Sequence, residues 1–126
     1  MKAKIIYSDK FLDNVGNIME AVGLSLWPFI ILRECYQKPT KYWRAKRDII
    51  INHESIHIAQ QGELLIIPFY LLYLLEWFIK LFFYGSSAYY NISFEREAYT
   101  HEYNKDYLKT RTPFSFLKYI YSEEKE

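Results

Sequence analysis

The chain has 126 residues, of which 51% are hydrophobic and 25% are charged, and 16 Lys and Arg residues nearly balance 15 Asp and Glu residues. This composition excludes a disordered or low-complexity polymer, and a net charge of +1 lacks the cationic excess that drives binding to nucleic acid. We therefore expect one globular domain over residues 1–126, without a nucleic-acid partner.

The sequence favours a cytoplasmic location. Its first ten residues contain basic side chains but no apolar run of the kind that a secretory signal peptide requires, so we predict no signal peptide. The single cysteine, Cys35, cannot close an intramolecular disulfide, which suits a reducing compartment.

The first predicted elements are a strand and a long helix. Residues Ala21 to Arg33 are mostly apolar, β-branched or aromatic, with a glycine and a proline among them, which predicts a bent strand or a hairpin. Gln37 to Arg47 is polar and basic, which is typical of a connecting loop. A helix is then predicted to begin near Asp48, a suitable N-cap or first-turn residue, and to end at Gly62.

An apolar segment follows from Leu64 to Tyr84, and as a helix it would reach about 31 Å, enough to cross a bilayer. Glu76 and Lys80 argue against a crossing, because each charge costs about 3 kcal/mol at a bilayer centre. The residues that can be polar recur every three or four positions, which marks one face of an amphipathic helix. We predict one helix bent at Pro68, or two shorter helices.

The last third of the chain is also predicted to be helical. Gly85 to Ser87 is a break, and Asn91 to Leu108 is the next predicted helix. Thr112 and Pro113 suit the N-cap and first position of a final helix, Phe114 to Tyr121. The expected fold class is therefore α+β and mainly helical, with a short N-terminal strand or hairpin.

The helix predicted from Asp48 carries an H-E-x-x-H motif, His53-Glu54-Ser55-Ile56-His57. Two histidines four residues apart lie one turn apart on the same face of a helix, so both imidazoles can bind one ion, and Zn²⁺ is the ion expected. Glu54 is the candidate general base, because it is placed to accept a proton from an activated water and pass it to a leaving amine.

A catalytic zinc site needs a third protein ligand from another element, and the candidates are Glu76, Glu95, Glu97 and His101. Glu95 is favoured because it shares a helix face with apolar and aromatic residues, and a carboxylate that points inward needs a partner such as a metal. Glu97 and His101, four residues apart, are expected to form a solvated pair, and Glu76 already has Lys80 as a partner. The alternatives to Glu95 stay open at this point.

Two patches, Ile50 to Ala59 and Ser93 to Tyr99, resemble zincin metallopeptidases of the gluzincin branch, as in the prenyl-protease-like and small bacterial H-E-x-x-H families. The second patch contains F-E-R-E-A, which looks like the F-E-x-x-A(D) signature of that branch. The resemblance implies a minimal zincin-like domain in which Glu95 is the third zinc ligand. The aspartate often found four residues after that ligand is here Tyr99, so the contact that orients a zinc histidine is expected from elsewhere.

The resulting hypothesis is a compact zinc-dependent metallopeptidase that acts on a peptide or protein substrate. Such an enzyme usually stabilises the oxyanion with an electrophilic side chain, for which Tyr99 and His101 are candidates. Gln60 and Gln61 follow the second histidine closely enough to hydrogen-bond a zinc ligand. The class also presents an edge strand, here expected near Gly23 to Trp27, to an extended peptide.

Two other classes stay open. One is a non-catalytic, metal-stabilised interaction module or pseudoenzyme, in which a fourth protein ligand such as Glu97 or His101 closes the metal site. The other is a metal-free membrane protein. A single span over Leu64 to Tyr84 would put the histidines and Glu95 on opposite sides of the bilayer, so a span and a shared ion exclude one another. A re-entrant hairpin at Pro68, or a helix lying on a membrane surface, is compatible with a shared ion.

Overall fold

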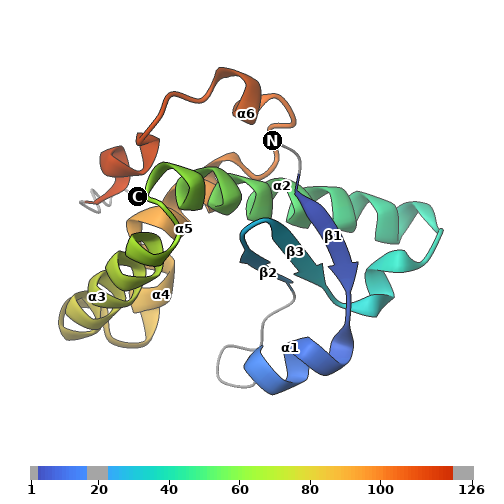
Figure 1. Cartoon of the computed structure of the whole chain (residues 1–126), viewed down its shortest axis with the longest axis horizontal. Helices are drawn as coiled ribbons and strands as arrows, with labels where there is room; N and C mark the ends of the chain where they lie inside the picture. The colour runs from blue at the N-terminus through green and yellow to red at the C-terminus, as the bar shows by residue number, and fades with distance from the viewer. Residues whose placement is uncertain (1–2, 17–22, 121–126) are drawn as a thin grey trace.

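The computed structural model describes residues 3–16 and 23–120, and its fold is mainly helical with one small sheet (Figure 1). The strands are β1 (Lys4–Tyr7), β2 (Gly23–Leu26) and β3 (Phe29–Leu32). The longer helices are α1 (Asp9–Gly16), α2 (Lys41–Glu63), α3 (Ile67–Tyr84) and α5 (Ser93–His101). The short helical segments are η1 (Glu34–Gln37), η2 (Gly85–Ser87), α4 (Ala88–Asn91), α6 (Tyr107–Thr110) and η3 (Ser115–Tyr119). The expected class, α+β and mainly helical, is confirmed.

The sheet has the order β1-β3-β2, with β3 parallel to β1 and antiparallel to β2. β2 and β3 form the hairpin predicted between Ala21 and Arg33, of which residues 21 and 22 lie outside the described part of the chain. β1 and α1 were not predicted from the sequence. Because β3 is central, β2 is an edge strand.

Helix α2 runs through the middle of the molecule, with the sheet on one side and the C-terminal segments on the other (Figure 1). It begins at Lys41, so the predicted start near Asp48 was wrong. The loop predicted from Gln37 to Arg47 was wrong from Lys41 onward. The side chain of Thr40 accepts a hydrogen bond from the backbone N–H of Trp43 and caps the helix. The basic residues of these first turns are exposed or partly exposed. The polar composition that predicted a loop therefore belongs to the exposed start of a helix.

Two apolar clusters hold the elements together. The first joins β3 and η1 to α2, and its buried members are Ile30, Leu32, Tyr36 and Ile58. The second joins α3, α5 and η3, and its buried members are Phe69, Ile92, Phe94 and Phe116. The ring of His57 on α2 lies 6.4 Å from that of Phe69, so the second cluster packs beside this histidine.

The segment after α2 folds into one helix, α3, because Pro68 lies in its first turn and starts the helix without bending it. Before it, the N–H of Ile67 donates to the carbonyl of Leu65 across 2.7 Å around Ile66, whose φ of 62° and ψ of −72° make a γ-turn. This turn changes the chain direction sharply, and α3 and α4 then lie side by side (Figure 1).

The helix predicted from Asn91 to Leu108 is confirmed over α5, but its extension to Leu108 was wrong, because α5 ends at His101 and a loop separates it from α6. The side-chain amide of Asn52 on α2 donates to the carbonyl oxygens of His101, Glu102 and Asn104 at 2.8 to 3.3 Å. These contacts satisfy carbonyls that a longer helix would have used, and so stabilise the early end of α5.

The predicted final helix is only the short η3, whose N-cap is Phe114, with a φ of 62°, and not Thr112. The hydroxyl of Thr112 instead shares a hydrogen bond of 2.9 Å with that of Ser115. Tyr121, the last residue of that prediction, lies outside the described residues.

Candidate metal centre

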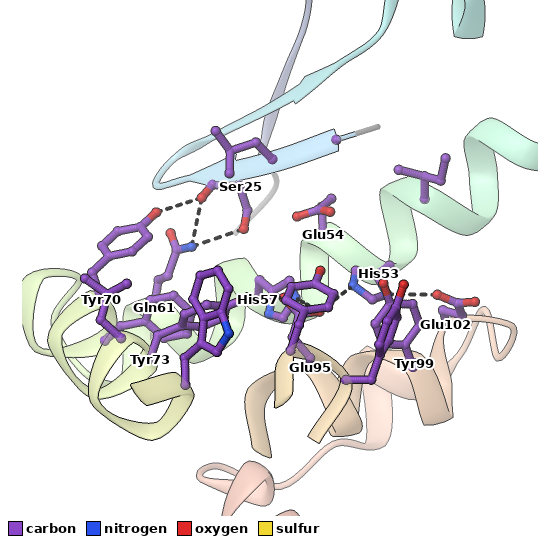
Figure 2. Close-up of a pocket in the computed structure, with 18 residues that line it drawn as sticks. Ser25, His53, Glu54, His57, Gln61, Tyr70, Tyr73, Glu95, Tyr99 and Glu102 are labelled. Atoms are coloured by element: carbon purple, nitrogen blue, oxygen red, sulfur yellow. Dashed lines mark hydrogen bonds and ion pairs between the residues drawn. The ribbon is translucent and has the colours of Figure 1, made fainter. Parts of the chain in front are cut away.

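Three buried side chains from two helices converge beside the middle of α2 (Figure 2). The Nε2 atoms of His53 and His57 each lie 3.1 Å from Oε1 of Glu95 on α5. Exposed fractions are 6% for His53, 4% for His57 and 4% for Glu95. The donor atoms of the three lie within 4.8 Å of one another, and within residues 3–16 and 23–120 no fourth His, Cys, Asp or Glu joins the group.

The outer nitrogen of each imidazole is held by an oxygen acceptor. Nδ1 of His53 lies 2.8 Å from Oε1 of Glu102, and Nδ1 of His57 lies 2.8 Å from Oε1 of Gln60. The Gln60 amide group donates to the Phe94 carbonyl at 3.1 Å, which fixes its oxygen toward the ring of His57. Because these acceptors hold a proton on each Nδ1, each Nε2 is the nitrogen that can give up its proton to offer a lone pair to a metal ion at the centre.

The electrostatics of the centre are those of an anion held among imidazoles. Burial lowers the pKa of His57, but the charge and hydrogen bond of Glu95 outweigh burial and raise this pKa to about 9. Burial raises the pKa of Glu95, and the two imidazoles outweigh it and hold that pKa well below its usual range. The buried carboxylate therefore needs positive charge beside it, which a divalent cation on the same three donors would supply.

Tyr73 of α3 completes the support of Glu95. Its hydroxyl donates to Oε2 of Glu95 across 2.6 Å, while Oε1 faces the two histidines. The carboxylate is thus oriented with one oxygen toward the centre and the other anchored to a different helix.

Glu54 is buried on the side of α2 that faces β2 (Figure 2). A Cβ added to Gly23 would lie 3.1 Å from the side chain of Ile50 on α2 and 3.5 Å from Oε2 of Glu54, so glycine allows β2 to approach α2 this closely. Burial raises the pKa of Glu54, although the neighbouring histidines oppose the shift. A carboxylate with a raised pKa is a better proton acceptor near neutral pH.

A cleft of about 600 Å³ opens beside the centre and includes the three donors and Glu54 in its lining. Gly23, Leu24 and Ser25 of β2 form one wall, and aromatic residues of α3, α4 and α5 form much of the rest. The cleft is large enough to hold several residues of an extended peptide against an edge strand.

Gln61, a predicted partner of a zinc ligand, instead connects α2 to β2. Its side chain accepts from the N–H of Trp27 at 2.9 Å and donates to the carbonyl of Ser25 at 3.1 Å. The hydroxyl of Tyr70 donates to the same carbonyl at 2.7 Å. Gln61 thus sets the wall of the cleft, whereas its neighbour Gln60 contacts the histidine.

The two predicted electrophiles lie in different places. Tyr99 lines the cleft, with its ring 4.4 Å from that of His53. Burial raises the pKa of Tyr99 to about 12, so its hydroxyl keeps its proton and can donate at neutral pH. His101 does not line the cleft: its Nε2 lies 2.8 Å from the Tyr119 hydroxyl, and its ring stacks on Tyr107.

The other carboxylates considered as third ligands have partners elsewhere. Glu97 is fully buried, so its expected solvated pairing with His101 was wrong, and its carboxylate accepts from Arg111, Tyr107 and Gln60. Glu76 lies 2.7 Å from Lys80, as expected. Of the carboxylates considered, Glu95 is the one that reaches the two histidines.

Sequence reasoning missed Glu102 and Tyr73 as supports of the centre. Glu102 lies just beyond the end of α5, so its position depends on the loop held by Asn52 and has no helical periodicity to reveal it. Tyr73 did carry a signal, because it belongs to the recurring face of α3 that can be polar.

Comparison of the chain with protein-family models, with curated proteins and with solved structures finds no match. The interpretation of the centre therefore rests on its own geometry and chemistry.

Proposed function

We propose that the protein is a zinc-dependent metallopeptidase with a minimal zincin-like domain, in which His53, His57 and Glu95 hold the ion. One observation carries the proposal: two imidazoles whose Nδ1 atoms face oxygen acceptors turn both Nε2 atoms toward the same buried carboxylate. This donor set is the one that catalytic zinc prefers, and three protein donors leave a coordination position open toward the cleft.

When bound, zinc supplies Lewis acidity, which polarises a peptide carbonyl and makes a coordinated water acidic near pH 7. The chain's residues supply the rest. Glu54 accepts a proton from the attacking water, whose oxygen forms the new bond to the carbonyl carbon. The same carboxyl then delivers that proton to the amide nitrogen as the C–N bond breaks, so the products are a carboxylate and an amine.

Other residues position the substrate and the charge that develops on it. The edge strand β2, held by Gln61 and Tyr70, is placed to pair with an extended peptide along the cleft. Tyr99 is the candidate donor to the developing oxyanion, because it lines the cleft beside His53 and retains its proton. A structural role for the ion is less well supported, since neither Glu97 nor His101 belongs to the donor group in the described part of the chain.

The test compares zinc binding and peptide hydrolysis in the full chain without a histidine tag. Calorimetric titration with zinc should give one site per chain, and His53→Ala should abolish it. Glu54→Gln should retain zinc but lower hydrolysis of a mixed-sequence fluorogenic peptide library by about 10² to 10⁴-fold. Asp48→Asn is the matched control, because it makes the same chemical change on an exposed position of α2. Full hydrolysis by Glu54→Gln would exclude its role, and a chain that does not bind zinc would exclude the whole proposal.

A further inference from the structure

A helix on a protein surface usually turns its apolar side chains inward and its charged side chains toward solvent, and helix α3 does the opposite. Only Phe69 and Lys80 of α3 are buried, and ten of its Leu, Ile and Phe side chains are exposed. The segment beginning at Ile67 is also long and apolar enough to cross a membrane by length and composition. Its outer face therefore presents a large, continuous apolar surface, of a kind that marks a partner or a lipid surface.

The two charged residues of α3 are turned toward the protein. Nζ of Lys80 donates to Oε2 of Glu76 at 2.7 Å and to the carbonyls of Asn91 and Ile120. Glu76 also accepts from the backbone N–H and the hydroxyl of Ser93, each at 2.7 Å. With both charges neutralised inside, the outer face of α3 carries no charged group.

The width of this apolar face distinguishes lipid from a protein partner. At 100° per residue, the exposed Leu, Ile and Phe positions cover an arc of about 200° around the helix, whereas a helix that packs on one neighbour needs an apolar stripe of about 100°. A second copy of α3 would therefore leave much of the arc in water. Lipid, which has no fixed shape, can cover all of it.

The exposure is equally high at both ends of the face. Ile67 is 69% exposed and Leu65, just before α3, is 76%, while Phe82 and Phe83 are 76% and 77% exposed. A helix that inserted by one tip would not need an apolar surface along its whole length. The even distribution suits a helix that lies in the plane of the membrane interface.

An apolar groove of about 550 Å³ continues this face between α3 and η3. It is lined mostly by apolar side chains, among them Leu72, Leu75, Ile79, Phe114, Leu117 and Ile120. Such a groove can hold methylene groups, but it offers few hydrogen-bond partners to a peptide backbone.

We infer that the protein is a monotopic membrane protein, which docks on a phospholipid bilayer by burying the outer face of α3 in one leaflet. Insertion from one side agrees with the contact between Glu95 and the two histidines, which a single span over α3 would separate. The inference does not depend on metal chemistry, because none of the exposed residues of this face belongs to the candidate centre.

The test is flotation of the purified full chain with vesicles of phosphatidylcholine, which carries no net charge. The protein is expected to float equally at low and high salt, because an apolar contact is not screened by ions. The double substitution Leu75→Glu and Phe82→Glu should lower vesicle partitioning by roughly ten- to hundredfold for each side chain. Both positions are exposed, so circular dichroism and zinc binding should stay as in the parent.

The matched control is Tyr42→Glu, at an exposed aromatic residue in the first turn of α2, which should float like the parent. Glu54→Gln should also float like the parent, so that failure of hydrolysis and failure of lipid binding are separate results. A parent chain that stays in solution would overturn the inference. A parent that does not float but sediments as a dimer, which Leu75→Glu/Phe82→Glu converts to a monomer, would identify α3 as a contact between two copies instead.

The single substitutions Ile67→Trp, Leu75→Trp and Phe82→Trp test the orientation of the helix. With lipids brominated near the glycerol or near the end of the acyl chain, in-plane docking predicts the same quenching depth at all three positions, after subtraction of the parent signal. A greater quenching depth for Leu75→Trp than for Ile67→Trp and Phe82→Trp would indicate a span and overturn the one-leaflet arrangement.

Discussion

Nδ1 of His53 lies 2.8 Å from Oε1 of Glu102, a carboxylate that belongs to neither of the helices carrying the three donors. Since Tyr99 occupies the position where gluzincins often have an aspartate, the contact that orients a histidine was expected from elsewhere, and Glu102 makes such a contact. The orientation of His53 therefore depends on the loop after α5, which Asn52 of α2 holds by three carbonyls.

Replacement of Glu102 by Gln is expected to weaken zinc binding by about 10 to 100-fold, because the Nδ1 proton of His53 loses its anionic acceptor. Calorimetric titration with zinc measures the effect, and circular dichroism checks the fold. The control is Asp106→Asn, an exposed carboxylate in the same loop region, which should bind zinc like the parent. Equal affinities for Glu102→Gln and the parent would show that Glu102 does not position the ring.

Substitutions of the adjacent residues Gln60 and Gln61 should have different effects, the first on the metal centre and the second on the wall of the cleft. Gln60→Met removes the acceptor at Nδ1 of His57 and should lower zinc affinity by about 10 to 100-fold. Gln61→Met should leave zinc affinity unchanged while lowering the free energy of unfolding by about 1 to 3 kcal/mol, because Trp27 N–H and the Ser25 carbonyl lose a buried partner. Zinc titration and urea unfolding of both variants measure the two effects. The assignment fails if Gln61→Met weakens zinc binding as much as Gln60→Met does.

Arg111 should contribute much of the stability on the far side of α2. Its guanidinium is buried and contacts Glu63 of α2 and Glu97 of α5, each at 2.5 Å. Burial raises the pKa of Glu97 on its own, and hydrogen bonds from Arg111 and its neighbours outweigh burial and hold that pKa below its usual value. Arg111→Met leaves two carboxylates without their cation and should cost about 3 to 5 kcal/mol in urea unfolding.

Lys109→Met is the control for Arg111, because its side chain is 80% exposed and pairs only loosely with Asp106 at 3.5 Å. It should change the free energy of unfolding by less than about 0.5 kcal/mol. Similar values for the two variants would mean that the Arg111 pairs only offset the cost of burying their charges.

The sequence predicted local features of the candidate site better than its long-range contacts. The motif spacing placed both histidines on one face of α2, and the apolar face of α5 indicated that Glu95 points inward, as observed. The support from Glu102 and Tyr73 depends on where other elements end and pack, which no local pattern encodes.

The fold shows the same division between local and long-range information. The hairpin, the end of α2 near Gly62 and the helical state of α3 followed from local patterns. β1 was missed because the strand it pairs with, β3, lies more than twenty residues away in the sequence. The two faces of α3 were correctly separated by periodicity, yet periodicity alone does not say which face is inside, and here the charged one is.

The contact between Tyr73 and Glu95 shows that the two sides of α3 have different surroundings. Its inner side touches a proposed zinc ligand, and its outer side is the surface that we infer to lie in lipid. The thickness of one helix, about 10 Å, then separates the reacting bond from the hydrocarbon. The two proposals together imply that polypeptides would be cut at a fixed height above the bilayer, and that bonds buried within it or far from its surface would be spared.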